Sequence, residues 1–404
     1  MSKNSYDVAV VGAGPAGGRA ASLIANAGYR VAIIEEHREV GEPVQCAGLI
    51  TPRCFDILGY ARDTIINKVS GADIYSPSGE SLSIGKSATQ ACVIDRAAFD
   101  KRVLGQAHNA GATLVPGKRI THIARQGDLI SLNRGEMTAN LVIGADGAKS
   151  VVKKFLGLEE PAYLLNGFSA DVSGLDMDSA RVKLFFGRDV APNFFAWMIP
   201  AGDIVRVGLC VRDSEFTVHE HFKRLFTTGA SSGFLKGGKI LAAHSGQIPL
   251  GILPATHGDN GMVVGDAACQ VKATSGGGIY PGLVCASHCA ETAVKALESG
   301  NLSGRYLSMY HKKWTSGIGE ELEKALMMHR IYASLDESQM QDVFRMLRNP
   351  EILELINNVG DIDYPSRLGW TLLRKEPGLL KYTGKIIKHR SEEHTSELQS
   401  RITI

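Results

Sequence analysis

The stretch Tyr6-Asp-Val-Ala-Val-Val-Gly-Ala-Gly-Pro-Ala-Gly17 decides how this chain is expected to fold. An apolar run typical of a strand leads directly into a GxGxxG turn, and the residues after the turn have the pattern of a helix. Gly12 permits the tight turn, Gly14 lets the backbone approach a phosphate, and Gly17 lets helix and strand pack closely. The sequence therefore predicts a strand, a tight turn and a helix over 15–27.

A second strand, expected over 30–34, ends at Glu35, which lies at the distance from the glycine turn that a ribose-binding acid requires. A carboxylate there can accept hydrogen bonds from both ribose hydroxyls. The turn residues Pro15 and Ala16 open a helix whose free N–H groups favour a phosphate. The unit therefore predicts a Rossmann-type dinucleotide site. The alternative interpretation is that Glu35 and Glu36 are solvated charges.

A second glycine-rich region lies far along the chain, where Gly265-Asp266 follow the apolar residues Gly261-Met-Val-Val264. The triple glycine 276–278 comes soon afterwards and leads into a long apolar helix expected over 279–298. A lone GxGxxG is weak evidence, because glycine-rich turns are common. Two such regions, each at the end of an apolar strand, indicate one long cofactor bound at both ends, and this cofactor is expected to be FAD.

A third turn, Gly144-Ala-Asp146-Gly147, also ends an apolar strand. Alone it could be an ordinary Asp-Gly turn. Together the three regions resemble the flavin hydroxylase-like proteins. That resemblance assigns flavin contacts to a larger set of positions: Asp146 and Gly147, Asp266 on the ribityl chain, Gly276, Gly277, Gly278 and Ile279 at the isoalloxazine ring, and Arg96 beside the flavin. For Arg96, a plain charge at the start of a helix is the alternative.

Within this superfamily the chain resembles the geranylgeranyl reductases, above all the archaeal enzymes that saturate digeranylgeranylglycerophospholipids. Three segments carry the resemblance: Pro43-Val-Gln-Cys-Ala-Gly48, Pro192-Asn-Phe-Phe-Ala-Trp-Met-Ile-Pro200 and Thr274-Ser-Gly-Gly-Gly-Ile279. Phe195 replaces a tyrosine of the family pattern, and Ile199 replaces a phenylalanine. The wall stays apolar, but the substitutions weaken any assignment of the exact substrate.

The resemblance implies a role for Cys46 in catalysis, either positioning an alkene or donating a proton. It also places Cys46, Ala47 and Gly48 against the flavin, although a small buried residue would suit the same loop. Phe195 and Trp197 are expected to bind substrate. They belong to an aromatic-rich run, and an ordinary β-sheet core is the alternative for all five of its members: Phe185, Phe186, Phe194, Phe195 and Trp197.

The implied function is FAD-dependent reduction of C=C bonds in the geranylgeranyl chains of a polyprenyl lipid. Because one dinucleotide fingerprint is present, the electron donor could be ferredoxin, NAD(P)H or a reduced deazaflavin. Two alternatives stay open. One is an FAD-dependent monooxygenase acting on a small aromatic substrate, and the other is a non-catalytic prenyl-binding escort protein.

The composition of the chain limits the kinds of partner that the protein is expected to bind. The 44 basic and 42 acidic residues give a formal charge of +2, so the sequence does not predict nucleic-acid binding. Seven cysteines without disulfide-like spacing suit a reducing compartment, and no apolar run reaches the ~20 residues of a membrane span. We therefore expect a cytoplasmic protein. Residues 368–373 are a candidate contact with the inner membrane face, and interior packing is the alternative for that segment. Cys285, His288 and Cys289 share a helix face but lack a second ligand pair, so no metal is expected.

These patterns predict an α/β fold with a discontinuous Rossmann-type, glutathione-reductase-like FAD-binding domain. An antiparallel-sheet substrate domain is inserted into it, and a helical region follows. The predicted division is 1–68, 94–158 and 256–300 for the FAD-binding domain, 69–93 and 159–255 for the substrate domain, and 301–389 for the helical region. Residues 390–404 have no apolar period and resemble a translated sequencing adapter, which predicts a non-native or disordered tail.

Overall fold

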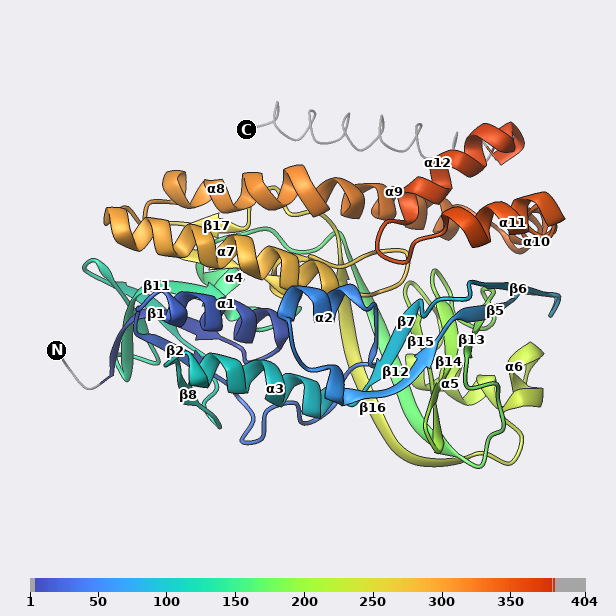
Figure 1. The fold of residues 1–404 in the computed structure, drawn as a ribbon, viewed down its shortest axis with the longest axis horizontal. Coiled ribbons are helices and arrows are strands. Elements are labelled where there is room, and N and C mark those ends of the chain that lie inside the picture. The colour runs from blue at the N-terminus through green and yellow to red at the C-terminus, as the bar shows by residue number, and fades with distance from the viewer. Residues whose placement is uncertain (1–3, 380, 382–404) are drawn as a thin grey trace.

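The glycine turn lies between β1 (Ser5–Val11) and α1 (Pro15–Asn26), as the sequence predicts. β1 is flanked in parallel by β2 (Val31–Ile34) on one side and by β11 (Met137–Gly144) on the other. The computed structural model describes residues 4–379 and 381. Figure 1 shows two lobes side by side, with a layer of C-terminal helices running along both. The predicted fold class is confirmed.

The first lobe is built on an eight-stranded sheet in which β17, β18, β11, β1, β2 and β8 lie in that order, with a hairpin of β9 and β10 attached to β11. The helices α1, α3 and α7 pack together beside it, and their small apolar residues form one core with β1 and β2. The chain leaves this sheet at β11 and returns to it with β17 and β18, of which β18 pairs with β11. The elements not yet placed are β8 (Thr113–Val115), β9 (Ile123–Gln126), β10 (Leu129–Leu132), β17 (His257–Gly258), β18 (Gly261–Val263), α3 (Arg96–Asn109) and α7 (Ile279–Ser299).

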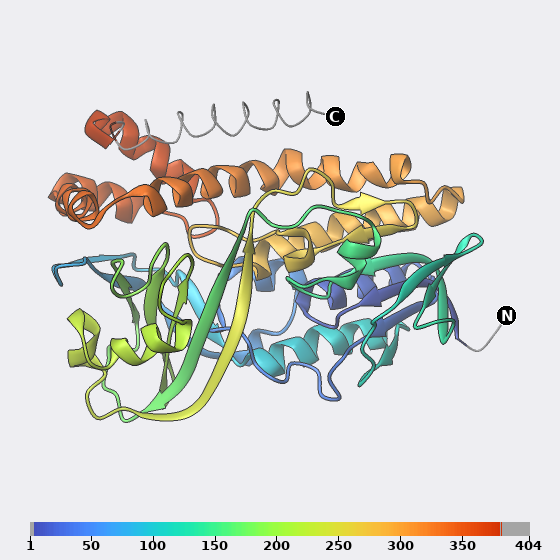
Figure 2. The same cartoon turned by 180° about the vertical axis from the view of Figure 1, so that it is seen from behind.

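The second lobe is a seven-stranded sheet in the order β16, β12, β15, β14, β13, β5 and β6. Its pairs are antiparallel except for β13 and β5. The long strands β12 and β16 run from one lobe into the other, as seen from behind in Figure 2. The strands are β5 (Gly71–Tyr75), β6 (Ser81–Gly85), β12 (Tyr163–Ser173), β13 (Arg181–Phe186), β14 (Phe195–Ala201), β15 (Ile204–Val211) and β16 (Lys239–Leu250).

Two short helices, α5 (Val218–Leu225) and α6 (Gly229–Phe234), interrupt the stretch that the sequence predicts to be strand-rich. α5 begins with a capping box in which the Thr217 side chain accepts from the Glu220 N–H and Glu220 accepts from the Thr217 N–H. The Thr-x-x-Glu spacing is visible in the sequence and would have predicted this helix.

A small third sheet joins the lobes. It contains β3 (Leu49–Ile50), β4 (Ile65–Val69) and β7 (Ala91–Ile94). Along the chain, α2 (Arg53–Leu58) lies between β3 and β4. β7 therefore does not join the substrate sheet, although the sequence predicts short strands of a second sheet throughout 69–94. The boundaries of the domain division stay a prediction.

The C-terminal layer is helical, as predicted. Pro350 and Pro365 stand in the first turn of their helices, where the missing N–H costs nothing, so each proline begins a helix. None of the helices among residues 4–379 and 381 has the apolar length that crossing a bilayer requires. The predicted tail, 390–404, lies outside the described residues. The remaining helices are α4 (Val151–Phe155), α8 (Gly304–Trp314), α9 (Glu320–Ser334), α10 (Glu337–Leu347), α11 (Pro350–Val359) and α12 (Pro365–Lys375).

Candidate cofactor and substrate cavity

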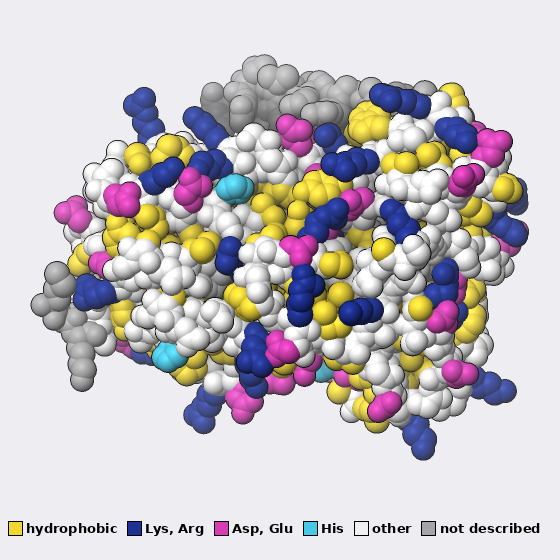
Figure 3. Space-filling model, in the orientation of Figure 1, with side chains coloured by type: hydrophobic (Ala, Val, Ile, Leu, Met, Phe, Trp, Pro, Cys, Tyr) yellow, Lys and Arg dark blue, Asp and Glu magenta, His cyan; other side chains and the backbone are white. Residues whose placement is uncertain are grey.

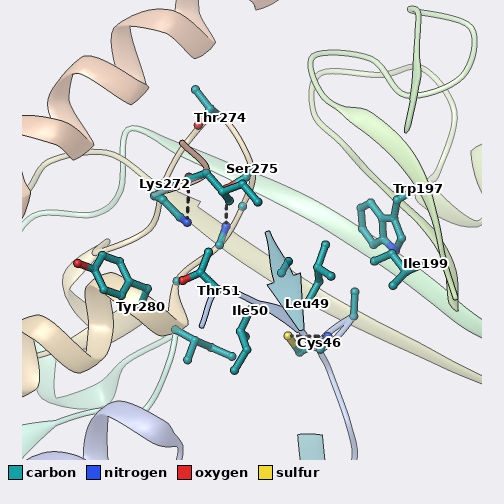
Figure 4. Close-up of a pocket in the computed structure, with 18 of the residues that line it drawn as sticks. Cys46, Leu49, Ile50, Thr51, Trp197, Ile199, Lys272, Thr274, Ser275 and Tyr280 are labelled. Atoms are coloured by element: carbon teal, nitrogen blue, oxygen red, sulfur yellow. Dashed lines mark hydrogen bonds between the residues drawn. The ribbon is translucent and has the colours of Figure 1, made fainter. Parts of the chain in front are cut away.

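A cavity of about 720 Å³ lies where the two lobes and the C-terminal helices meet. Figure 4 shows Trp197 and Ile199 on the opposite side of it from Lys272 and Tyr280, with Cys46 in between. Most of the residues that the sequence singles out line it: Gly14, Pro15, Ala16, Cys46, Ala47, Gly48, Arg96, Gly147, Phe195, Trp197, Asp266, Gly276, Gly277, Gly278 and Ile279. Gly12, Gly17, Glu35 and Asp146 lie outside its lining.

The glycine turn has the steric properties of a phosphate-binding turn. Gly12 has φ +101°, and a Cβ there would lie 2.2 Å from the carbonyl oxygen of Ala145. A Cβ on Gly17 would lie 2.1 Å from the carbonyl oxygen of Gly12. Gly14 is different, because a Cβ there would meet no protein atom within 4 Å, and the residue faces the cavity. Gly12 and Gly17 are therefore glycines for packing, whereas Gly14 leaves space for a ligand.

Glu35 lies at the end of β2, beside the glycine turn. Its carboxylate accepts hydrogen bonds from the Ala13 N–H at 3.0 Å and from the His37 N–H at 3.0 Å, and it contacts His37 Nδ1 at 2.8 Å. The side chain is 13% exposed. The carboxylate is thus held next to the N-terminus of α1 but outside the cavity lining, at the place where a Rossmann domain binds an adenosine ribose.

The Asp146 side chain forms hydrogen bonds with other residues of the protein and does not line the cavity. Its carboxylate accepts from the hydroxyl of Ser150 and, at 2.7 Å, from the N–H of Val151, at the start of α4. Burial raises the pKa of this carboxyl, although the hydrogen bond from Ser150 opposes the rise. The side chain shapes the loop from within and brings Gly147 to the cavity.

Asp266 offers an unpartnered carboxylate to the cavity. Within the described part of the chain no group donates a hydrogen bond to it, and burial raises its pKa, which Arg96 partly offsets. A Cβ on Gly278 would lie 2.8 Å from Asp266 Oδ1, so that glycine makes room for the carboxylate. Asp266 is half-buried, and a carboxylate at a cavity wall without a protein donor is free to accept hydrogen bonds from a ligand. The ribityl hydroxyls of FAD are suitable donors, and the site therefore fits this cofactor.

Arg96 begins α3 and lies between Cys46, which lines the cavity, and Asp100 on the same helix. Its Nε donates to Asp100 Oδ1 at 2.8 Å, and its guanidinium also interacts with Cys46. Burial alone would lower the pKa of Arg96, but Asp100 and Cys46 outweigh it and hold the pKa above the ordinary value. Arg96 is therefore a permanent cation beside the thiol, and it is more than a solvated charge at a helix start.

The Cys46 loop is anchored from the other lobe. Arg206 on β15 donates from Nη1 to the carbonyl oxygens of Ala47 and Ile94, each at 2.9 Å. A Cβ on Gly48 would lie 2.3 Å from the same Nη1, so the glycine admits the arginine. The Gly48 N–H donates to Cys46 Sγ at 3.3 Å. Sequence reasoning missed Arg206, because a single arginine in an alternating strand gives no signal of the loop it holds.

The aromatic wall comes mainly from β14. Phe195 and Trp197 face the cavity, and Phe194 stacks on Phe195 with ring centroids 4.3 Å apart. Phe186 also lines the cavity. Phe185, the neighbour of Phe186 on β13, points to the other face of the sheet and stacks on Tyr75. Four of the five aromatic residues thus line the cavity. Strand alternation separates Phe186 from Phe185 and puts Phe195 and Trp197 on one face, whereas Phe194 lies just before β14.

A glycine on β15 makes the indole of Trp197 fit. A Cβ on Gly208 would lie 2.5 Å from the Trp197 ring and 2.8 Å from Ser169 Cβ. Cys210 lines the cavity on the same strand, and burial raises the pKa of its thiol to about 12. Cys285 and Cys289 are buried in the helical core, and residues 4–379 and 381 hold no group of three side chains suited to a metal ion.

The class of protein follows from this cavity and from a match to known sequences. The family described as FAD binding domain matches residues 5–183. The glycine turn and the open space at Gly14 lie within the matched residues, and the free carboxylate of Asp266 lines the same cavity from outside them. The chain is a flavin-dependent oxidoreductase that uses FAD.

Similarity to known proteins shows which family of flavin-dependent oxidoreductases the chain belongs to. An uncharacterized protein of Methanocaldococcus jannaschii is 32% identical over 93% of this chain and 96% of its own length. A digeranylgeranylglycerophospholipid reductase of the same organism is 30% identical over 93% of this chain and 97% of its own length. A crystal structure of a geranylgeranyl bacteriochlorophyll reductase-like protein from Thermoplasma acidophilum has the same fold, with a TM-score of 0.82 at 22% identity over 94% of this chain and 98% of that one. The chain belongs to the geranylgeranyl reductase family.

Proposed function

We propose that this protein saturates C=C bonds in the geranylgeranyl chains of archaeal membrane ether-lipid precursors, with digeranylgeranylglycerophospholipid as the substrate. The observation that carries the proposal is one cavity with two unlike walls. Backbone, glycines and Asp266 form the wall suited to a flavin, and Phe195, Trp197 and Ile199 form a wall suited to a hydrocarbon chain. A reductase of isolated alkenes needs both ligands in one enclosed space.

The apolar wall supplies binding energy for the lipid. Removing each CH₂ group from water contributes about 0.8 kcal/mol. Successive isoprene units of a polyprenyl chain should therefore bind with increasing affinity until the chain fills the space. A small aromatic substrate would bury much less of this wall.

When FAD is bound and has been reduced by the electron donor, it would supply the hydride for one alkene carbon. The residues around it align the alkene, exclude water and provide the proton for the other carbon. We propose Cys46 for the last role, because its thiol lines the cavity beside Arg96 and its loop is fixed by Arg206. Arg96 is a cation, so it can hold an anionic thiolate after the proton has left.

Substitution of Cys46 tests that role. Cys46→Ala should keep FAD bound and reduce the rate of alkene reduction, and Cys46→Ser should rescue part of it because a hydroxyl can still relay a proton. Full turnover by Cys46→Ala would remove the thiol from the mechanism. A matched control is Cys54→Ala, which removes a buried thiol that also borders the cavity but lies on α2.

The function itself is tested by mass spectrometry of ether lipids after co-expression with the enzymes that make the unsaturated precursor. The proposal predicts lipids with hydrogen added to the geranylgeranyl chains under anaerobic conditions. An oxygen-dependent hydroxylated product would instead identify a monooxygenase. A protein that binds prenyl lipid and leaves it unchanged with every electron donor would identify an escort protein.

The electron donor is a separate proposal. We propose that it docks transiently and transfers electrons to bound FAD, because the sequence has one dinucleotide fingerprint. Turnover with ferredoxin, NAD(P)H and a reduced deazaflavin, each supplied alone, separates the three candidates. The expected result is lipid reduction with one of them and little with the other two.

We also propose that the protein contacts the membrane face that contains its substrate. Leu368 lines the cavity, whereas Trp370 is 51% exposed on α12 and Ile362 is 41% exposed on the loop before it. The exposed Arg367 and Arg374 share the helix face of Trp370. Over the remaining surface in Figure 3, charges of both signs are interspersed. Trp370→Ser should weaken sedimentation with anionic lipid vesicles and leave FAD content unchanged; equal sedimentation would contradict the contact.

A further inference from the structure

A buried lysine lies in the wall of the cavity, outside every motif assigned above. The Lys272 side chain is 4% exposed, and its Nζ donates to Asp363 Oδ1 at 2.6 Å and to the carbonyl oxygen of Ile362 at 3.2 Å. Asp363 is fully buried. Both residues line the cavity, and Figure 4 shows Lys272 on the same loop as Thr274 and Ser275.

The pair belongs to a chain of charges between two parts of the molecule. Asp363 Oδ2 is 3.1 Å from Arg53 Nη1, and Arg53 also donates twice, at 2.8 Å each, to Asp361. Burial would raise the pKa of Asp361, but its hydrogen bonds from Arg53 outweigh burial and hold the pKa below the ordinary value. Lys272 lies on a loop of the cavity wall and Arg53 begins α2, whereas both carboxylates come from the segment between α11 and α12.

Lys272 is rigidly part of the glycine loop. Its N–H donates to the Gly277 carbonyl oxygen at 3.2 Å, and the Gly276 N–H donates to the Lys272 carbonyl oxygen at 2.8 Å. A Cβ on Gly277 would lie 3.1 Å from Lys272 Cε and 3.5 Å from its Nζ. The ammonium therefore lies against the glycine backbone, and the glycine provides the space for the lysine stem.

We propose that Lys272 tunes the bound flavin: its ammonium favours the reduced, anionic form of FAD, and Asp363 limits that effect by neutralising part of the charge. The inference rests on the proposed contact of the glycine loop with the isoalloxazine ring. Reduction adds negative charge to a flavin, and a fixed cation in a poorly solvated wall stabilises it. A carboxylate on the same cation acts in the opposite direction.

The direction in which two substitutions shift the reduction potential of bound FAD separates this role from a purely structural one. Removing the cation in Lys272→Met should lower the reduction potential of bound FAD, and removing the anion in Asp363→Asn should raise it. If the pair served only to dock the C-terminal helices, both variants would loosen the same contact. Their potentials would then shift in the same direction or stay at the wild-type value.

The experiment is anaerobic titration of the purified holoprotein against redox dyes, with FAD absorbance as the readout. Lys272→Met should favour oxidised over reduced FAD at least tenfold more than wild type does, which is about 30 mV for a two-electron couple. Lys272→Arg should restore most of the shift. Lys153→Met is the matched control, since Lys153 is a buried lysine paired with Glu160 outside the cavity lining, and its potential should match wild type.

Shifts of the same sign in Lys272→Met and Asp363→Asn, or a shift as large in Lys153→Met, would overturn the inference. Lys272→Gln covers the case in which the methionine variant does not fold. If neither neutral variant retains FAD, Asp363→Asn decides alone, because its potential must rise. No lipid enters this measurement, so unchanged potentials would leave the proposed reductase activity standing, and failed lipid reduction would leave the potential shifts intact.

Discussion

The two walls of the cavity are built in different ways. The wall suited to the flavin is made largely of backbone: Gly14 leaves room for a ligand at the cavity, and behind it Gly12 and Gly17 leave no room for a side chain in the turn. The opposite wall is made of side chains, chiefly Phe195, Trp197 and their neighbours on the substrate sheet. A cofactor common to many enzymes is thus held by main-chain geometry, and a more particular ligand is held by side chains that can be exchanged one at a time.

This difference predicts that substitutions on the two walls will impair different properties of the protein. Side chains added at the crowded glycines Gly12 and Gly17 should disturb FAD binding and folding together, whereas changes at Gly14 or Asp266, which face the cavity, should weaken FAD binding alone. Changes on the aromatic wall should alter lipid binding while FAD stays bound.

Gly12→Val should abolish FAD binding and folding of the first lobe. A side chain there meets the Ala145 carbonyl oxygen, and the backbone needs a positive φ that valine strongly disfavours. The measurement is FAD content and thermal unfolding of the purified variant. Gly14→Ala is the matched control: its new methyl group meets no protein atom, so the apoprotein should be as stable as wild type while FAD binds more weakly. Equal loss of stability in both variants would contradict the separate roles of the two glycines.

Asp266→Ala should weaken FAD binding by about ten- to a hundredfold, because a hydrogen bond to a charged group contributes about 1.5–3 kcal/mol. The free carboxylate has no protein donor to lose within the described residues, so unfolding of the apoprotein should change little or shift toward greater stability. Fluorescence titration of the apoprotein with FAD measures the effect. Unchanged affinity would show that the carboxylate does not contact the cofactor.

Gly208→Val should destabilise the substrate sheet by about 1–3 kcal/mol through overpacking and displace the Trp197 ring. Lipid reduction should fall while FAD remains bound, since Gly208 lies on β15, away from the glycine turn. Urea unfolding and FAD content are measured on the same preparation. Loss of FAD together with lipid turnover would break the separation of the two walls.

A smaller effect concerns His329, which is packed behind the aromatic wall against Phe194 and Tyr163. Burial, with Arg212 and Arg330 nearby, lowers its pKa from 6.5 to about 4. The unfolded chain therefore binds this proton more readily, so stability should fall as pH drops from about 6.5 toward 4, by up to about 1.4 kcal/mol per pH unit, and should not respond above that window.

His329→Leu isolates this contribution, since other histidines titrate in both proteins. The difference in unfolding free energy between variant and wild type should grow in favour of the variant as pH falls from 7.5 to 5. A difference independent of pH would mean that His329 is protonated without penalty in the folded state.

The contrast between the walls also explains what the sequence could predict. The backbone wall was found in advance because a glycine that faces a phosphate or a crowded turn is a local requirement, as at Gly12, Gly14 and Gly276. The aromatic wall was found only as a cluster. Which face Phe185 and Phe186 occupy depends on the register of β13 with β14, which the local pattern does not give.

The sequence did not predict the contacts between segments that lie far apart along the chain. Arg206 reaches Ala47, and Lys272 meets Asp363, across separations along the chain that leave no periodic trace in the sequence. Asp146 was placed at the correct turn, yet its carboxylate caps α4, a choice decided by side-chain geometry. Resemblance to a family supplied the function; composition and spacing alone supported a dinucleotide-binding fold.

The central claim is that one cavity brings FAD and a polyprenyl chain together, and a single-turnover reaction tests it most directly. The holoprotein is reduced photochemically without oxygen and mixed with digeranylgeranylglycerophospholipid, while flavin absorbance and lipid mass are followed. The flavin should be reoxidised, and the lipid should gain two hydrogen atoms for each flavin reoxidised. A flavin that stays reduced until oxygen is admitted, with the lipid mass unchanged, would contradict it.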